Sequence, residues 1–159
     1  MKTLPRLLAA LLAVAALPVA APAASPIPAV EYASADAGAE GMTVTRAKDG
    51  LFYVDVLVNG QPVRFLVDTG ANTVVLTAAD AARLGLRADT SIWGPQMNTA
   101  GGKTPMAWAK LDHVRVAGRD LHGLKAAVVA SGLPVSLLGQ NMLSQLGSLT
   151  FAGDRLLLR

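Results

Sequence analysis

The chain has 159 residues, 52% of them hydrophobic and 16% charged, which is enough for one domain with a sizeable core but not for two catalytic lobes. It contains no cysteine, which excludes a disulfide scaffold, a cysteine nucleophile and thiolate zinc sites, and it has only two histidines. The formal net charge of +3 includes Lys2 and Arg6, so the rest of the chain is nearly neutral and gives no reason to expect nucleic acid as a partner.

The N-terminus has the layout of a secretory signal, with a basic start, the apolar run Leu7–Leu17 and a small-residue cleavage site at Ala21–Ala23. The apolar run is shorter than the roughly 20 residues that span a bilayer. We therefore predict that residues 1–24 are a signal peptide, with an uncleaved N-terminal anchor as the alternative. Either case predicts an extracytoplasmic domain, periplasmic or secreted, which a retained leader would tether to the membrane.

Residues 25–41 are rich in Ala, Pro, Gly and Ser and predict a flexible tether. Residues 42–159 form the predicted domain. Its short runs of β-branched and aromatic residues, bounded by turn formers, predict an all-β domain that is closed or sandwiched.

The first half of this domain predicts strands and one short helix. Asn59–Pro62 supplies a turn at hairpin spacing, and Thr77 can cap a helix that stops at Gly85. The predicted strands are Leu51–Val58, Val63–Val67 and Val74–Leu76.

The second half predicts three hairpins and a second helix, Gln140–Leu146. The tip of the first hairpin, Gly101 and Gly102, carries no side chain to obstruct a close approach. The hairpin strands are Gln96–Ala100 with Lys103–Trp108, Leu111–Val116 with Leu121–Val129 around a turn at Ala117–Asp120, and Ser148–Phe151 with Arg155–Leu158.

Two motifs suggest chemistry. Asp68-Thr69-Gly70-Ala71 directly follows an apolar strand, where an ionised carboxylate is costly unless it is solvated, paired or hydrogen-bonded. The second motif is Leu137–Gly139, in which two large apolar residues run into a glycine that opens a helix. Taken alone, the first motif could be an ordinary turn and the second a plain strand–turn–helix junction.

Together, Val67–Ala71 and Leu137–Gly139 resemble the retropepsin-type aspartic proteases, and the resemblance extends over about Leu51–Arg159. Pro134–Phe151 is similar to the C-terminal helix and strand of retroviral proteases, whereas the leader and the Gly153–Arg159 extension are similar to bacterial secreted or anchored members. The resemblance implies a closed single-lobe acid-protease barrel with two short helices and a flap hairpin, which dimerises.

Aspartic proteolysis requires two neighbouring carboxylates, one ionised to activate a water and one protonated to polarise the peptide carbonyl. The chain has a single Asp-Thr-Gly motif, so a monomer would hold half an active site. The second Asp68 must then come from a symmetry mate, which predicts a C2 homodimer acting on peptide or protein substrates.

The resemblance also implies roles for individual residues and calls for no metal or other cofactor. The catalytic residue is Asp68; the supporting residues are Thr69, Gly70 and Ala71; the substrate-binding residues are Asn72, Val75, Gly101, Gly102, Val135 and Leu137.

Two departures from the family pattern carry expectations. Asn72 and Gln140 stand where retroviral members have an acidic residue and an arginine, so we expect a hydrogen bond in place of an ion pair. Ala71 stands where pepsin-like lobes have Ser or Thr. Without that hydroxyl the ionised dyad is less stabilised, which predicts activity at mildly acidic or neutral pH.

Other signals are weaker. His113 and His122 lack a third imidazole and are expected to be surface turn residues, and Trp93 and Trp108 bracket the predicted flap. The main alternative function is a non-catalytic dimeric β module that binds extended peptides in the same groove. A further alternative is a latent protease that dimerises only when the leader concentrates it at a membrane.

Overall fold

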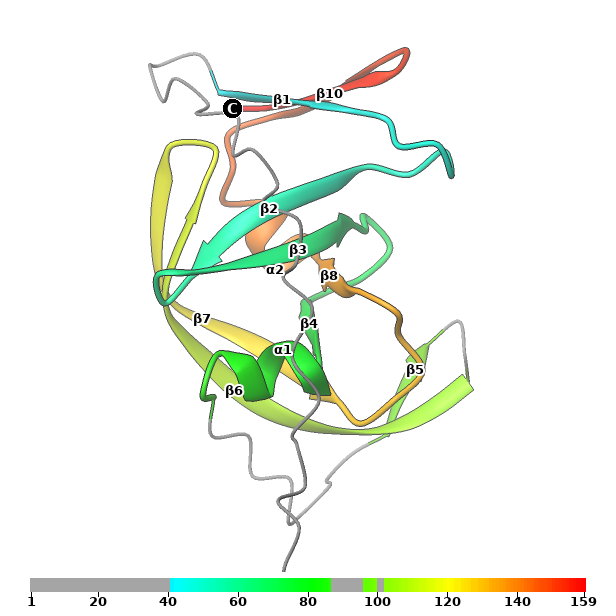
Figure 1. Ribbon diagram of the computed structural model, residues 1–159. Helices are drawn as coiled ribbons and strands as arrows, with labels where there is room; N and C mark the ends of the chain where they lie inside the picture. Colours follow the sequence, from blue (N-terminus) through cyan, green and yellow to red (C-terminus); the bar gives the residue numbers. More distant parts are fainter. Residues whose placement is uncertain (1–40, 87–95, 100–101) are drawn as a thin grey trace, which may run out of the picture. The chain divides into compact units, whose positions relative to one another are not determined.

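The alternation of apolar and polar residues builds a closed β-barrel in the computed structural model, which describes residues 41–86, 96–99 and 102–159 (Figure 1). The predicted leader, nearly all of the tether, Trp93 and Gly101 lie outside the described residues, so the domain boundaries and the extracytoplasmic location stay predictions. Within the described ranges, no helix is long and apolar enough to cross a membrane.

The barrel closes because the strands pair in the order β2-β3-β8-β4-β7-β6 and β6 pairs back onto β2 through Leu57↔Arg115 and Val58↔Val114. A further strand, β5, pairs only with β6 and extends the sheet beyond the barrel. The prediction of an all-β closed barrel is thus confirmed. The strands are β2 Tyr53–Val58, β3 Gln61–Val67, β4 Val74–Thr77, β5 Gln96–Thr99, β6 Gly102–Val116, β7 Arg119–Val129 and β8 Ser136–Leu138.

A separate three-stranded sheet, in the order β1-β10-β9, is formed by Met42–Thr45, Arg155–Leu158 and Leu149–Ala152. Both strand pairings are antiparallel, and β9 and β10 form the predicted last hairpin. Leu156 and Leu158 are fully buried and join the same hydrophobic cluster as the barrel strands. This sheet is therefore packed onto the barrel rather than loosely attached.

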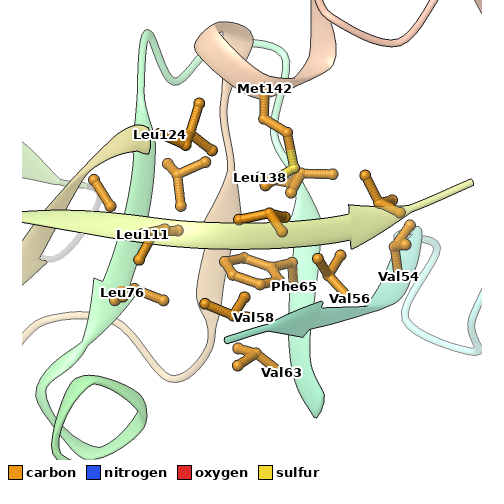
Figure 2. Packing of buried hydrophobic residues seen from close by; sticks show 14 of the residues in the cluster. Val54, Val56, Val58, Val63, Phe65, Leu76, Leu111, Leu124, Leu138 and Met142 are labelled. Carbon is orange, nitrogen blue, oxygen red and sulfur yellow. The ribbon is translucent and has the colours of Figure 1, made fainter. Parts of the chain in front are cut away.

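The core fills the barrel with side chains from alternate positions of its strands. Along β2, Val54, Val56 and Val58 point inward, while Asp55 between them is exposed. Figure 2 shows the Phe65 ring surrounded by aliphatic side chains, with Leu111 of β6 and Val58 nearby. The burial of these residues supplies the main driving force for closing the barrel.

Two turns are tighter than the sequence predicted. Asn59 and Gly60 have φ values of 49° and 80°, as a two-residue type I′ hairpin requires, so Gln61 already pairs with Val58. Ala117 and Gly118, at 48° and 73°, make the same kind of turn between β6 and β7. The predicted four-residue turns were therefore too long.

The strand β6 is continuous where the sequence predicted two strands, Lys103–Trp108 and Leu111–Val116. Ala109 and Leu111 both face the core, so the inward-facing alternation passes through the predicted break without interruption. The prediction of two strands was wrong because Lys110 is an outward-facing strand residue and not a turn residue.

Both predicted helices exist, but the second is shorter than expected. The first, α1 (Ala78–Arg83), is capped by Thr77, whose Oγ1 accepts a hydrogen bond of 3.1 Å from the Asp80 amide. The second, α2, covers only Gln140–Leu143. Beyond it, the amides of Gln145 and Leu146 donate to carbonyls three residues earlier, so the chain tightens into turns instead of continuing the α-helix.

Candidate active site

The fold brings the two sequence motifs side by side. Strands β3 and β8 are parallel neighbours with Val67 paired to Leu138, and each motif continues from the end of its strand. The Asp68 amide donates to the Leu138 carbonyl at 3.1 Å. Asp-Thr-Gly and Leu-Leu-Gly, which are far apart in the sequence, therefore form one structural unit.

Main-chain hydrogen bonds join the two turns beyond the strands. The amide of Gln140 donates to the Ala71 carbonyl at 2.8 Å, and the amide of Asn141 donates to the Asn72 carbonyl at 3.2 Å. A side chain at Gly139 would overlap the Thr73 carbonyl, so the turns can approach this closely only because position 139 is glycine. This contact fixes the Asp68 turn against the start of α2.

The Asp68 carboxylate is half-buried and lies beside exposed residues, Thr69 and Gly70. Its Oδ1 accepts a hydrogen bond of 2.9 Å from the Gly70 amide, and the Asp68 carbonyl accepts one of 3.2 Å from Ala71. The turn thus holds the carboxylate in a defined position while leaving it open to an incoming group.

Asp68 lies at a cavity of about 470 Å³ with a mainly apolar lining. The predicted substrate residues Asn72, Val75, Val135 and Leu137 all line it, as do Gly70 and Ala71. Sequence analysis did not single out several further lining residues. These are Leu66, Thr73, Met97, Asn98, Gly132, Leu133 and Pro134.

Some of the cavity residues that the sequence analysis did not single out line the cavity because they pack on a small cluster of buried residues. Val75 is buried with Met106, Ala127 and Val129 in a small cluster against which Met97, Leu133 and Leu137 pack. One wall of the cavity is therefore the surface of a minor core. Of these residues, Met97 and Asn98 could have been suspected from their place in the predicted flap hairpin.

The described strands of the predicted flap hairpin are confirmed. β5 and β6 pair antiparallel from Gln96↔Pro105 to Thr99↔Gly102. Gly102 has a φ of 103°, a backbone conformation that residues other than glycine rarely adopt. It does not line the cavity. The other predicted tip residue, Gly101, lies outside the described residues, so contact of the flap tip with substrate stays a prediction.

The predicted hydrogen bond between Asn72 and Gln140 is replaced by a different one. The Gln140 side chain donates from Nε2 to the Thr69 carbonyl at 2.9 Å. The side chain of Asn72 lines the cavity instead. The side-chain amide of Gln140 thus supports the Asp68 turn directly.

Asn141 is a further support that the sequence analysis did not identify. Its Oδ1 accepts from the Val74 amide at 2.8 Å, and its Nδ2 donates to the Lys125 carbonyl at 2.7 Å. Thr73 Oγ1 donates to the same carbonyl at 3.3 Å. These bonds attach α2 to β4 and β7, directly behind the cavity wall.

The two histidines lie within strands β6 and β7, so the expectation that they are turn residues was wrong. Their rings stack with centroids 4.9 Å apart, and His113 Nε2 lies 2.6 Å from Asp120 Oδ1. Hydrogen bonds from Arg115 and His113 hold the pKa of Asp120 below its usual range. In the part of the chain that the structure describes, no group of three or more His, Cys, Asp or Glu side chains could hold a metal ion.

The chain is a single-lobe barrel in which an Asp-Thr-Gly turn is hydrogen-bonded to a Leu-Leu-Gly turn. The family model described as "gag-polyprotein putative aspartyl protease" matches residues 54–145. The chain belongs to the retropepsin-like aspartic protease family.

Solved structures of family members resemble this one. A retropepsin-like aspartic protease from Rickettsia conorii has a TM-score of 0.66 and 32% identity, covering 74% of this chain and 88% of that one. The protease of equine infectious anemia virus, solved with the inhibitor HBY-793, has a TM-score of 0.55 and 27% identity, covering 69% of this chain and all of that one.

An uncharacterized protein of Rickettsia prowazekii is 33% identical over 115 residues, which are 72% of this chain and 49% of the relative. The chain thus spans about half the length of this curated relative.

Proposed function

We propose that the protein is an aspartic endopeptidase whose active site is assembled from two copies of the chain, each contributing Asp68. The observation that carries this proposal is the composition of the cavity. Among the described residues that line it, Asp68 is the only one with a carboxylate. Water activation by an aspartic dyad requires a second carboxyl group nearby, which a partner copy would supply.

The surface beside Asp68 suits such a partner. Thr69, the next residue, does not line the cavity but a second hollow of about 300 Å³. The other described residues that line this second hollow come from α2 and from the segment after α2. They are Gln140, Leu143, Ser144, Leu146, Gly147, Ser148, Leu149 and Phe151. The Phe151 ring packs edge-to-face on Phe52 with centroids 5.6 Å apart and is still 54% exposed, so part of an aromatic ring in this hollow is open to a partner. We name this hollow and its lining the Thr69 surface.

The proposal predicts that activity follows dimer concentration. Sedimentation equilibrium of the protein, run beside cleavage of a mixed peptide library, should give a rate per subunit that rises with the dimer fraction. Replacing Phe151 by Ala should weaken association by about 10-fold, because it removes an aromatic anchor from the Thr69 surface. Trp108→Ala is the matched control, since Trp108 is 44% exposed on β6 and contacts Lys125 instead. A rate per subunit that is independent of concentration in a monomeric protein would contradict the two-copy site.

The pH profile tests the role of Ala71. Because the side chain of alanine has no hydroxyl to donate a hydrogen bond to the ionised dyad, we expect kcat/KM to be maximal at mildly acidic or neutral pH. Ala71→Ser should restore such a donor and move the acidic limb of the profile to lower pH. An optimum of the unaltered protein below about pH 3, towards the lower pKa of the pepsin dyad, would contradict this expectation.

The second candidate function is a dimeric module that binds extended peptides in the same cavity without cleaving them. The mainly apolar lining of the cavity, together with Met97 and Asn98 of β5 in its wall, favours peptide binding whether or not the peptide is cleaved. The two candidates differ in what Asp68 does, and the Asp68→Asn variant separates them.

A further inference from the structure

Ser136 is buried without any exposed area, and it shares its strand with the cavity wall. It occupies the first position of β8, between Val135 and Leu137, which both line the cavity. Because successive side chains of a strand point to opposite faces, the Ser136 hydroxyl points away from the cavity. A hydroxyl in such a place is costly to bury unless it is hydrogen-bonded.

The partner of this hydroxyl is Asp80, in α1. Ser136 Oγ donates to Asp80 Oδ2 at 2.6 Å and accepts from the Thr77 amide at 3.1 Å. Thr77 Oγ1 also donates to Asp80 Oδ2, at 3.0 Å. The capping residue of α1, the helix carboxylate and the buried serine of β8 thus form one hydrogen-bonded group.

Arg83 extends this group to a third element. Its Nη2 donates to Asp80 Oδ1 at 2.9 Å, while its Nη1 donates to the Pro62 carbonyl of β3 at 2.7 Å. The Asp80 carboxylate therefore links α1 to both β8 and, through the guanidinium group, the β2–β3 hairpin.

The main chain gives β8 limited support on one side. This strand is only three residues long, and it pairs with β4 at the single position Val75↔Leu137. Its other neighbour, β3, pairs with it at three positions. On the β4 side, the hydrogen bond from the Thr77 amide to Ser136 thus adds a second contact where the backbone pairing covers one position.

We propose that Asp80 is a positioning residue of the substrate cleft, whose carboxylate fixes Ser136 and thereby sets how far Val135 and Leu137 project into the cavity. The proposal rests on the endopeptidase function and assigns Asp80 and Ser136 a part in selecting apolar substrate side chains. Neither residue lines the cavity, so both act through the wall residues.

The charge state of Asp80 suits this role. Burial by itself would raise its pKa, but hydrogen bonds from Ser136, Arg83 and Thr77, together with the Arg83 charge, outweigh burial and hold the pKa below its usual range. The group is thus ionised at neutral and mildly acidic pH, where it accepts from all three donors. An asparagine would place an NH₂ group among these donors.

The test compares Asp80→Asn, Ser136→Ala and the double variant. For each, kcat/KM is measured on two peptides that differ only in one side chain next to the scissile bond, Leu in one and Ala in the other. We expect the Leu-to-Ala preference to fall about 5-fold, mainly through a higher KM for the Leu peptide. If the two residues act as one unit, the double variant should lose no more preference than a single one.

Two controls separate positioning from general destabilisation. Asp112→Asn removes an exposed carboxylate that lies 3.9 Å from Lys110 Nζ on β6, away from the cleft. Val63→Ala weakens the core, where Val63 is 1% exposed. Both controls should keep the Leu-to-Ala preference of the unaltered protein. An unchanged preference in Asp80→Asn and Ser136→Ala would overturn the proposal.

A second readout does not depend on cleavage. Amide hydrogen exchange should accelerate at Thr77, which donates to Ser136, and along β8 in both single variants but not in Asp112→Asn. Unchanged exchange at these amides would contradict the positioning role whatever the activity. An unaltered protein that cleaves no peptide would contradict the endopeptidase proposal. In that case the hydrogen-exchange rates at Thr77 and along β8 would still test whether Asp80 positions β8.

Discussion

Replacing Asp68 by Asn is expected to lower kcat/KM for peptide cleavage by on the order of 10³-fold or more. The amide can neither take a proton from the attacking water nor carry the negative charge that activates it. The barrel should persist, because Asp68 is half-buried and the Oδ1 that accepts from the Gly70 amide has an equivalent in the asparagine side-chain oxygen.

Two measurements make this prediction decisive. Cleavage and peptide binding are assayed in parallel, with Asp55→Asn as control, since Asp55 is an exposed carboxylate on β2. We expect Asp68→Asn to bind peptides without cutting them. Cleavage that survives this change would show that the enzymatic assignment is wrong, and an unaltered protein that binds but never cleaves would favour the peptide-binding module.

Mixing subunits tests the two-copy site directly. If each site needs Asp68 from both copies, an excess of Asp68→Asn subunits should draw the unaltered subunits into inactive mixed dimers and suppress the cleavage rate. An enzyme that is complete in one chain would keep its activity in the same mixture. This result would be independent of how strongly the variant itself is impaired.

Much of the barrel could be predicted because its strands repeat a local pattern. Val54, Val56 and Val58 alternate with outward-facing residues, and Asn59 and Gly60 marked the place of the first hairpin turn, although that turn is shorter than predicted. The errors occurred where local pattern and long-range packing differ. β6 passes through a predicted break because Ala109 and Leu111 keep facing the core, and α2 ends early in tight turns.

The candidate site was predictable as far as its motifs reach. Asp68, Val75 and Leu137 were identified from sequence and all meet at the cavity. The contacts that hold them were not predictable, because they join residues far apart in the chain. Gln140 donating to the Thr69 carbonyl and Ser136 donating to Asp80 follow from the three-dimensional pairing of β3, β4 and β8, which no local pattern states.

Gly139→Ala is expected to destabilise the protein by about 3 kcal/mol or more, and it tests why the second motif ends in glycine. Gly139 has a φ of −93°, which any residue can adopt, so backbone strain is not the reason. The reason is space. A Cβ at this position would overlap the Thr73 carbonyl and lie 2.9 Å from the Ala71 carbonyl oxygen, and backbone atoms cannot move aside as a flexible side chain can.

Urea unfolding of Gly139→Ala measures this cost, with Gly60→Ala as the matched control. Gly60 has a φ of 80° with no atom within 4 Å of an added Cβ, so the control carries only the conformational penalty, about 1 kcal/mol. If Gly139→Ala costs no more than this control, the close approach of the two turns is not what requires glycine. If it costs several times more, the Leu-Leu-Gly motif is explained by packing: its glycine lets the turn that carries Asp68 lie directly against the start of α2.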